Sequence, residues 1–201
     1  MSNFLLEAGR QTLMLELQEA SRLPERLGDD FIRAAETIIH CEGKLIVSGI
    51  GKSGHIGKKL AATFASTGTP SFFVHPAEAL HGDLGMIGAD DVVVFISYSG
   101  RAKELDLILP LLAENGIPVI AITGGKESPL AQAAACVLDI GVEREACPMG
   151  LAPTSSAVNT LMMGDALAMA LMRQRGFNAE DFARSHPGGS LGARLLNRVH
   201  H

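Results

Sequence analysis

The chain has 201 residues, of which 47% are hydrophobic and 19% charged, so it can form one domain with a substantial, mainly aliphatic core. Its formal net charge of −5 argues against a surface that binds nucleic acid through counterion release, and no apolar run is long enough to cross a membrane. Three cysteines without CxxC spacing, Cys41, Cys136 and Cys147, favour reduced thiols in a cytoplasmic protein.

The first 42 residues predict two helices that precede the first strand. Residues 4–25 place leucines at helical spacing, and Pro24 closes or restarts this pattern. Asp29 or Asp30 can cap a second helix that continues to about His40. Five apolar residues of this helix should face inward: Phe31, Ala34, Ala35, Ile38 and Ile39. Because both helices lie outside the α/β unit, we expect them to contact a symmetry mate in an oligomer.

Residues 43–201 alternate between strand, turn and helix. Five runs rich in Val, Ile and Phe, with little polar alternation, predict strands that are covered on both faces: 44–47, 71–74, 92–97, 118–123 and 137–140. Helices are predicted between and after these strands: 53–66, 102–115, 128–135, 154–175 and 179–185. Residues 153–156 are expected to cap the longest helix. This order predicts an α/β fold, a five-stranded parallel sheet of flavodoxin-like order 2-1-3-4-5 sandwiched by helices, in one domain over 1–201.

A glycine-rich turn, residues 49–54, joins the first predicted strand to a helix that begins near Lys52. A P-loop is excluded because the position that requires its first glycine is Ile46. The spacing fits G-x-G-x-x-G, but a dinucleotide site also needs an acidic residue that ends the next strand, and Glu78 lies only beyond that end. What remains is a loop for a small anionic group, with Lys52 and Ser53 at its tip.

Ser97 and Ser99 follow the third predicted strand and can converge with Ser53. In the predicted order, strands 1 and 3 are neighbours, and ligands bind at the carboxyl ends of such strands. Hydroxyl and N–H groups there would bind a phosphate, although the same serines could instead cap the helix that follows. Lys52 would contact the phosphate or stabilise a carbonyl or enediolate oxygen; alternatively, it is a solvent-exposed lysine.

A histidine cluster lies between the second and third predicted strands. His75, His81 and Asp83 could supply metal ligands, but their spacing matches no closed structural zinc site, so we expect no required metal. His81 is a better candidate for an acid, a base or a hydrogen-bond donor to a substrate. His75 stands before a proline and is expected to be structural.

Three further ionisable residues are candidates for catalysis. Glu104 lies on the first turn of a predicted helix, where it could act on a substrate or only complement the helix dipole. Glu145 follows the fifth strand at the same edge of the sheet and is available as a general base. His186 precedes Pro-Gly-Gly in a loop and could reach a neighbour's site as easily as its own.

Three longer motifs accompany these loops: HGDLGM, EACPMGLAPTSS and SHPGGSLG. With them, the whole chain resembles the sugar isomerase (SIS) domain of arabinose 5-phosphate isomerases, and among these the paralogue associated with glucitol-utilisation operons in enteric bacteria. Members of this family typically continue into a pair of CBS domains. The chain therefore resembles the catalytic domain alone.

The resemblance implies the SIS fold and an aldose–ketose isomerase that interconverts D-arabinose 5-phosphate and D-ribulose 5-phosphate through a cis-enediol. It also implies synthesis of the lipopolysaccharide sugar Kdo as the pathway, no required cofactor, and a homotetramer with sites near subunit boundaries. The family's catalytic set falls on five residues of this chain: Lys52, His81, Glu104, Glu145 and His186. Phosphate binding falls on three serines: Ser53, Ser97 and Ser99.

Such an isomerase needs a base, an electrophile and a group that binds and positions the substrate, here the phosphate-binding loops. We expect Lys52 to be the electrophile and Glu145 the base at carbon. His186 would move the oxygen proton or open the sugar ring. Glu104 and His81 would orient hydroxyl groups and set protonation states.

The chain departs from the family's pattern in the serine loop. Relatives often have a small polar residue, an acid and a hydroxyl where this chain has Tyr98, Arg101 and Ala102. The phosphate site then has fewer side-chain donors, which affects efficiency and substrate range more than reaction type. Two alternatives remain: an isomerase of another sugar phosphate, or a regulatory module that binds a sugar phosphate.

Overall fold

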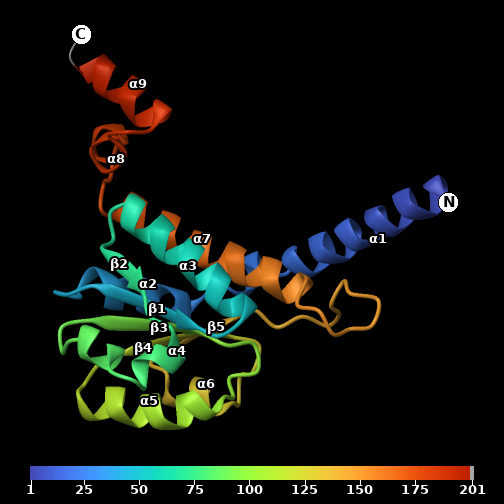
Figure 1. Ribbon diagram of the computed structural model, residues 1–201, viewed down its shortest axis with the longest axis horizontal. Coiled ribbons are helices and arrows are strands. Elements are labelled where there is room, and N and C mark those ends of the chain that lie inside the picture. Colours follow the sequence, from blue (N-terminus) through green and yellow to red (C-terminus); the bar gives the residue numbers. More distant parts are fainter. Residues whose placement is uncertain (200–201) are drawn as a thin grey trace.

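A parallel sheet forms the centre of the protein, which we describe from a computed structural model over residues 1–199. Its strand order, β2-β1-β3-β4-β5, is the predicted one (Figure 1). The strands lie within about two residues of their predicted ends: β1 (Leu45–Gly49), β2 (Ser71–Phe73), β3 (Val92–Ile96), β4 (Val119–Thr123) and β5 (Cys136–Asp139). All four neighbouring pairs are parallel, so the carboxyl ends of the strands share one edge.

Both faces of the sheet are apolar. Successive side chains of a strand point to opposite faces, and in these strands the side chains on both faces are hydrophobic. In β3, Val92, Val94 and Ile96 enter one core cluster. Val93 and Phe95 enter the other. This burial on both sides explains why the strands are hydrophobic without polar alternation.

Helices cover both faces (Figure 1). One face is covered by α2 (Asp29–Ile39), α3 (Lys52–Ser66) and α7 (Ser155–Gln174). The other is covered by α4 (Pro76–Ala79), α5 (Lys103–Glu114) and α6 (Pro129–Ala133). The inward face predicted for α2 is confirmed, since Ala34 and Ile38 are buried and Phe31, Ala35 and Ile39 pack against the same cluster.

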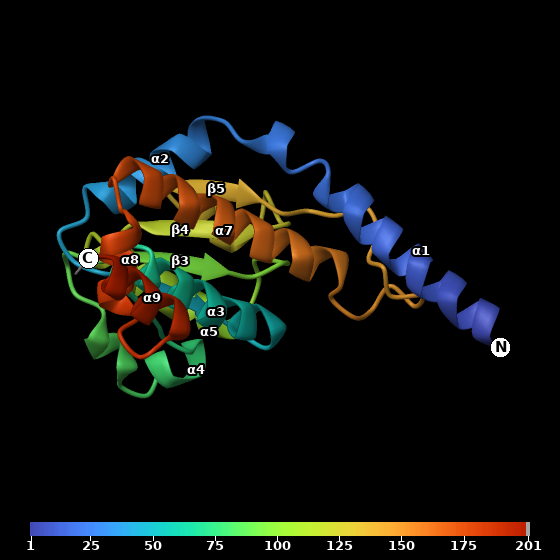
Figure 2. The ribbon, with the colours of Figure 1, turned by 90° about the horizontal axis from the view of Figure 1, so that it is seen from above.

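The first helix, α1 (Ser2–Ala20), projects from the sheet beyond the carboxyl ends of the strands (Figures 1 and 2). Its last turn is anchored, because Glu19 and Ala20 are buried. Along the rest of the helix Leu5, Leu13 and Leu17 are each more than 60% exposed. The predicted contact of this helix with another copy stays a prediction.

Four elements were not predicted, and three of them have only three or four residues, too few to give a clear periodicity. They are the 3₁₀ turns at Pro24–Arg26 and Asp83–Met86, the helix α4, and the helix α9 (Ser190–Val199) that follows α8 (Ala179–Ser185). The structural role expected of His75 is confirmed, since its Nδ1 accepts a hydrogen bond of 3.0 Å from Ala77 N and caps α4. Over residues 1–199, no helix is long and apolar enough to cross a bilayer.

Candidate functional site

The glycine turn after β1 brings the N-terminus of α3 to the carboxyl edge of the sheet. Gly51 has φ of 63°, the left-handed region that favours glycine. A Cβ on Gly54 would lie 2.6 Å from the Gly49 carbonyl oxygen, so only glycine lets the helix pack this close to the strand end. Lys52 and Ser53 therefore stand on the first turn of α3, where helix N–H groups favour an anion.

The three predicted phosphate-binding serines line one cavity of about 370 Å³. Ser53 comes from α3, whereas Ser97 and Ser99 come from the loop after β3. The Ser97 hydroxyl accepts from Gly100 N at 3.1 Å, and the Ser99 hydroxyl accepts from Arg101 N at 3.2 Å. These bonds shape the loop itself. The helix-cap alternative is wrong, because within the described residues no side chain caps α5.

A second cavity of about 280 Å³ adjoins the first and shares Ser53 and Tyr98 with it. Lys52 from α3 and Glu145 from the segment after β5 both line this second cavity. The structure thus brings five of the eight predicted site residues to one edge of the sheet: Lys52, Ser53, Ser97, Ser99 and Glu145. The arrangement joins a hydroxyl-rich compartment to one that holds a cation and a carboxylate.

Glu145 caps the N-terminus of α7. Its carboxylate accepts hydrogen bonds from Ser156 N at 2.8 Å and from Ser156 Oγ at 2.7 Å. The N-cap residue of α7, Thr154, lies within the predicted residues 153–156, but the side chain that accepts the hydrogen bonds at the helix N-terminus is that of Glu145. Thr154, the N-cap residue, instead accepts from Ala146 N and Cys147 N with its hydroxyl, at 2.8 and 3.2 Å. A carboxylate at this helix end is also favoured by the helix dipole.

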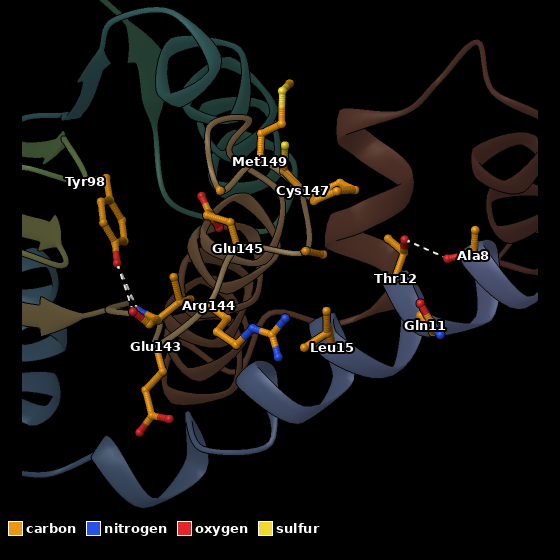
Figure 3. Close-up of a pocket in the computed structure, with 14 residues that line it drawn as sticks. Ala8, Gln11, Thr12, Leu15, Tyr98, Glu143, Arg144, Glu145, Cys147 and Met149 are labelled. Carbon is orange, nitrogen blue, oxygen red and sulfur yellow. Dashed lines mark hydrogen bonds between the residues drawn. The ribbon is translucent and has the colours of Figure 1, made fainter.

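A larger cavity of about 800 Å³ lies on the other side of Glu145, between α1 and the segment after β5 (Figure 3). Cys147 lines it, and backbone N–H groups of Ala152 and Leu151 lower the pKa of its thiol. Burial raises the pKa of the thiols of Cys41 and Cys136 instead. The cysteine beside Glu145 is therefore the one that ionises most readily.

His186 is not brought to this edge within one chain. Its Nδ1 lies 2.8 Å from the Phe182 carbonyl oxygen, and its ring stacks on Phe182 with centroids 3.8 Å apart. The neighbouring Ser185 donates to the carbonyl of Ser66, the last residue of α3. Lys52 is the first residue of that helix, so about 20 Å separates the two ends at the usual helical rise. Figure 2 shows α8 at the end of the sheet away from α1.

His81 and Glu104 also stand apart from the two small cavities. His81 is exposed between α4 and the 3₁₀ turn at Asp83–Met86, and Glu104 is half-buried on the first turn of α5. In the part of the chain that the structure describes, neither is among the residues that line these cavities. Within residues 1–199, no group of three or more His, Cys, Asp and Glu side chains could hold a metal ion.

The model of the SIS domain family matches residues 38–170 of the chain. The chain belongs to the SIS domain family. Arabinose 5-phosphate isomerase GutQ of Escherichia coli (strain K12) is 78% identical over 201 residues, 100% of this chain and 63% of GutQ. Arabinose 5-phosphate isomerase KdsD of Pseudomonas aeruginosa is 57% identical over 194 residues, 96% of this chain and 60% of KdsD. This SIS domain thus spans less than two thirds of either relative.

A solved structure supports the same family assignment. The structure of c3406 from E. coli CFT073 in complex with arabinose 5-phosphate is similar to this SIS domain with a TM-score of 0.89 and 41% identity, and the match covers 93% of this chain and 100% of that one. The predicted resemblance and fold are confirmed.

Sequence reasoning missed the contacts that three polar side chains make around Glu145 in this SIS domain. Ser156 binds its carboxylate, while Tyr98 and Glu19 hold the backbone just before it. Ser156 belongs to the residues that were expected to cap α7, but its partner Glu145 was not foreseen. Glu19 gives no such signal, because it lies 124 residues from its partner Glu143.

Proposed function

We propose that this SIS domain interconverts D-arabinose 5-phosphate and D-ribulose 5-phosphate. The observation that carries the proposal is the junction of two compartments at Ser53 and Tyr98, one lined by serines and one by Lys52 and Glu145. A five-carbon sugar phosphate would place its phosphate in the first compartment and C1 and C2 in the second. The names of GutQ and KdsD, and the arabinose 5-phosphate bound to c3406, support this substrate.

The reaction moves a proton between two neighbouring carbons. Glu145 would remove the proton from C2 of the aldose and return it to C1, while the hydroxyl proton moves from O2 to O1 through the cis-enediol. Lys52 would stabilise the negative charge that develops on oxygen in the transition state. The serine compartment would hold the phosphate, so that the reacting carbons stay in place while charge develops.

The hydrogen bonds of Glu145 suit the role of base. Ser156 takes one acceptor position on each carboxylate oxygen. A carboxylate has about four such positions, so the remaining ones can face the substrate. The same two bonds limit rotation of the side chain, which keeps the base aimed at one point.

We propose that the active form is a homotetramer in which His186 of one copy reaches the site of another. The distance between the two ends of α3 argues against His186 acting on its own chain's Lys52. The exposed leucines of α1 offer an apolar surface for a second copy. For the roles of His81 and Glu104, the support is the family resemblance alone.

We place the reaction in the cytoplasm, on the path to Kdo, without a required metal or cofactor and in one domain. Free Cys41, Cys136 and Cys147 support a reducing compartment. The pathway rests on the resemblance to arabinose 5-phosphate isomerases.

The test is NMR of the purified chain with D-arabinose 5-phosphate, with D-arabinose as the matched control that lacks the phosphate. We expect D-ribulose 5-phosphate from the phosphorylated sugar, nothing from D-arabinose, and the same rate after EDTA. Thermal stabilisation by D-arabinose 5-phosphate without product would indicate a regulatory module. Turnover of another sugar phosphate but not of this one would identify a different isomerase.

A further inference from the structure

Residues 142–147 carry Glu145 but form no helix or strand. The side chains of Glu143 and Arg144 are exposed, and Glu145 itself is only half-buried. Ala146 is the one buried residue of this segment, so apolar burial does little to fix residues 142–145. Its position depends on polar contacts from other elements.

Tyr98 makes the first of these contacts. Its hydroxyl accepts a hydrogen bond of 3.0 Å from Val142 N and donates to Val142 O at 3.4 Å (Figure 3). Tyr98 follows β3 and Val142 follows β5, and β4 lies between these strands. The tyrosine ring crosses the end of β4 over Gly124, where a Cβ would come within 2.7 Å of ring atom Cε2. Glycine at that position leaves room for the ring to span the gap.

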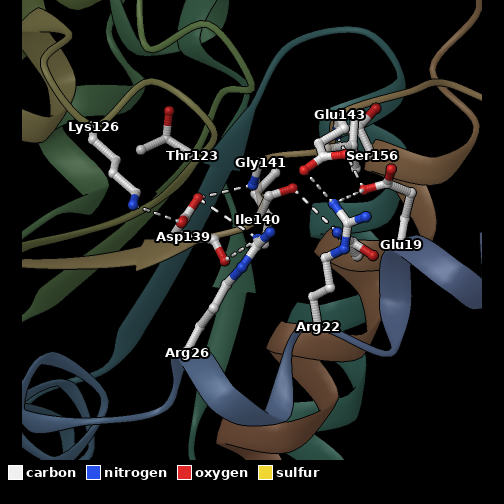
Figure 4. A network of polar contacts seen from close by, with 12 residues as sticks. Glu19, Arg22, Arg26, Thr123, Lys126, Asp139, Ile140, Gly141, Glu143 and Ser156 are labelled. Atoms are coloured by element: carbon white, nitrogen blue, oxygen red, sulfur yellow. Dashed lines mark hydrogen bonds and ion pairs between the residues drawn. The ribbon is translucent and has the colours of Figure 1, made fainter.

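Glu19 makes the second contact, from the opposite side. It is only 3% exposed, at the last turn of α1. One carboxylate oxygen accepts from Glu143 N at 3.1 Å and the other from Arg144 N at 3.2 Å. Arg22 lies 3.8 Å from the same carboxylate and provides a compensating charge (Figure 4). A buried carboxylate is stable only with such partners.

We propose that Tyr98 and Glu19 are positioning residues that hold residues 142–144 so that Glu145 faces Lys52. This inference rests on the proposed function. Three consecutive backbone N–H groups, those of Val142, Glu143 and Arg144, are bound by these two side chains. Glu145 is the next residue, and beyond it Thr154 binds the backbone N–H groups of Ala146 and Cys147. The backbone is thus held both before and after Glu145 in the sequence.

The test compares Tyr98→Phe and Glu19→Gln with the control Glu143→Gln. Phenylalanine keeps the ring over Gly124 and removes only the hydroxyl. Glutamine at position 19 replaces one of the two carboxylate oxygens with an amide NH₂, which cannot accept a hydrogen bond. One of the two backbone N–H groups, that of Glu143 or that of Arg144, then loses its acceptor. The control removes the 2.8 Å pair between Arg22 and the Glu143 side chain but keeps the backbone contacts of residue 143.

We expect kcat to fall roughly 10- to 100-fold in Tyr98→Phe and Glu19→Gln, because small displacements of reacting groups are costly. KM should change by less than about threefold, since the three phosphate-binding serines are unchanged and the Tyr98 ring that lines the serine compartment is kept. Native-state hydrogen exchange should be faster at the Val142 amide in Tyr98→Phe, and at the Glu143 and Arg144 amides in Glu19→Gln. Glu143→Gln should behave as the wild type in every measurement.

Unchanged exchange at these amides would overturn the proposal whether or not the chain is active. Faster exchange with wild-type kcat in an active enzyme would also overturn it, because the contacts would then be structural only. If the wild-type chain isomerises no sugar phosphate, the proposed function fails instead. The exchange measurement then still decides whether Tyr98 and Glu19 hold the segment.

Discussion

Ser99 has a hydroxyl that shapes its own loop and lines the serine compartment. Its Oγ accepts from Arg101 N and donates to Arg101 O, both at 3.2 Å. Because a hydroxyl has a single proton, Ser99 would turn that proton from the Arg101 carbonyl to the phosphate when a phosphate binds. If the phosphate sits in this compartment, Ser99 should affect binding more than turnover.

We therefore expect Ser99→Ala to raise KM for D-arabinose 5-phosphate about tenfold or more, with a small change in kcat. A hydrogen bond to a charged group contributes about 1.5–3 kcal/mol, and about 1.4 kcal/mol is a factor of ten in affinity. Steady-state kinetics measures both constants. Ser21→Ala is the matched control, because Ser21 is exposed at the end of α1 and donates to the Gln18 carbonyl. An unchanged KM in Ser99→Ala would place the phosphate elsewhere.

At the scale of elements, polar side chains join the helices to the sheet. Asp30 on α2 accepts a hydrogen bond of 3.0 Å from Val137 N on β5 and pairs with Arg33. The Val137 N–H and then Arg33 lower the pKa of the Asp30 carboxyl. A lowered pKa means that folding favours the ionised form. The stabilisation is present above the unfolded pKa and is lost as pH falls through the folded pKa.

We expect Asp30→Asn to lower the free energy of unfolding by about 1 kcal/mol or less at pH 7, since the side chain is partly exposed to solvent. The difference from the wild type should shrink as the pH falls below about 3.9, the ordinary Asp value. Urea denaturation at pH 7 and pH 3 measures it, with the exposed neighbour Asp29→Asn as control. An effect of Asp30→Asn that is as large at pH 3 as at pH 7 would contradict this explanation.

The elements that the sequence predicted well are those with long apolar patterns. The strands were found because both faces of the sheet are covered, and α3 and α7 because they are long. The role of Glu145 at the N-terminus of α7 was missed because this acceptor lies 11 residues before its donor, Ser156. The contacts of Tyr98 and Glu19 span 44 and 125 residues, distances at which no local pattern operates.

At the scale of the whole molecule, the predicted site divides into two groups. Lys52, Glu145 and the serines meet at the carboxyl edge, while His186 lies near the far end of α3. The sequence could place His186 in a loop but not at one end of the sheet, because that position depends on how α8 packs after α7. A site shared between copies would reunite the two groups.

Subunit complementation tests the shared site. We expect Lys52→Ala and His186→Ala to be nearly inactive alone, and their mixed oligomers to regain up to about a quarter of the wild-type activity, because random pairing gives that share of intact sites. Native mass spectrometry of the co-expressed chains establishes that mixed oligomers form. Mixed oligomers that form but stay inactive would show that each site uses residues of a single copy.

The most direct measurement is proton NMR of D-arabinose 5-phosphate turnover in D₂O by the wild type and by Glu145→Gln, with Glu143→Gln as the neighbouring control. We expect the wild type and the control to incorporate deuterium at C1 of D-ribulose 5-phosphate. Glu145→Gln should lose roughly 10²–10⁴-fold in turnover, as expected for a positioned base, with little change in KM. Deuterium incorporation by Glu145→Gln at the wild-type rate would contradict the assignment of Glu145 as the base at carbon.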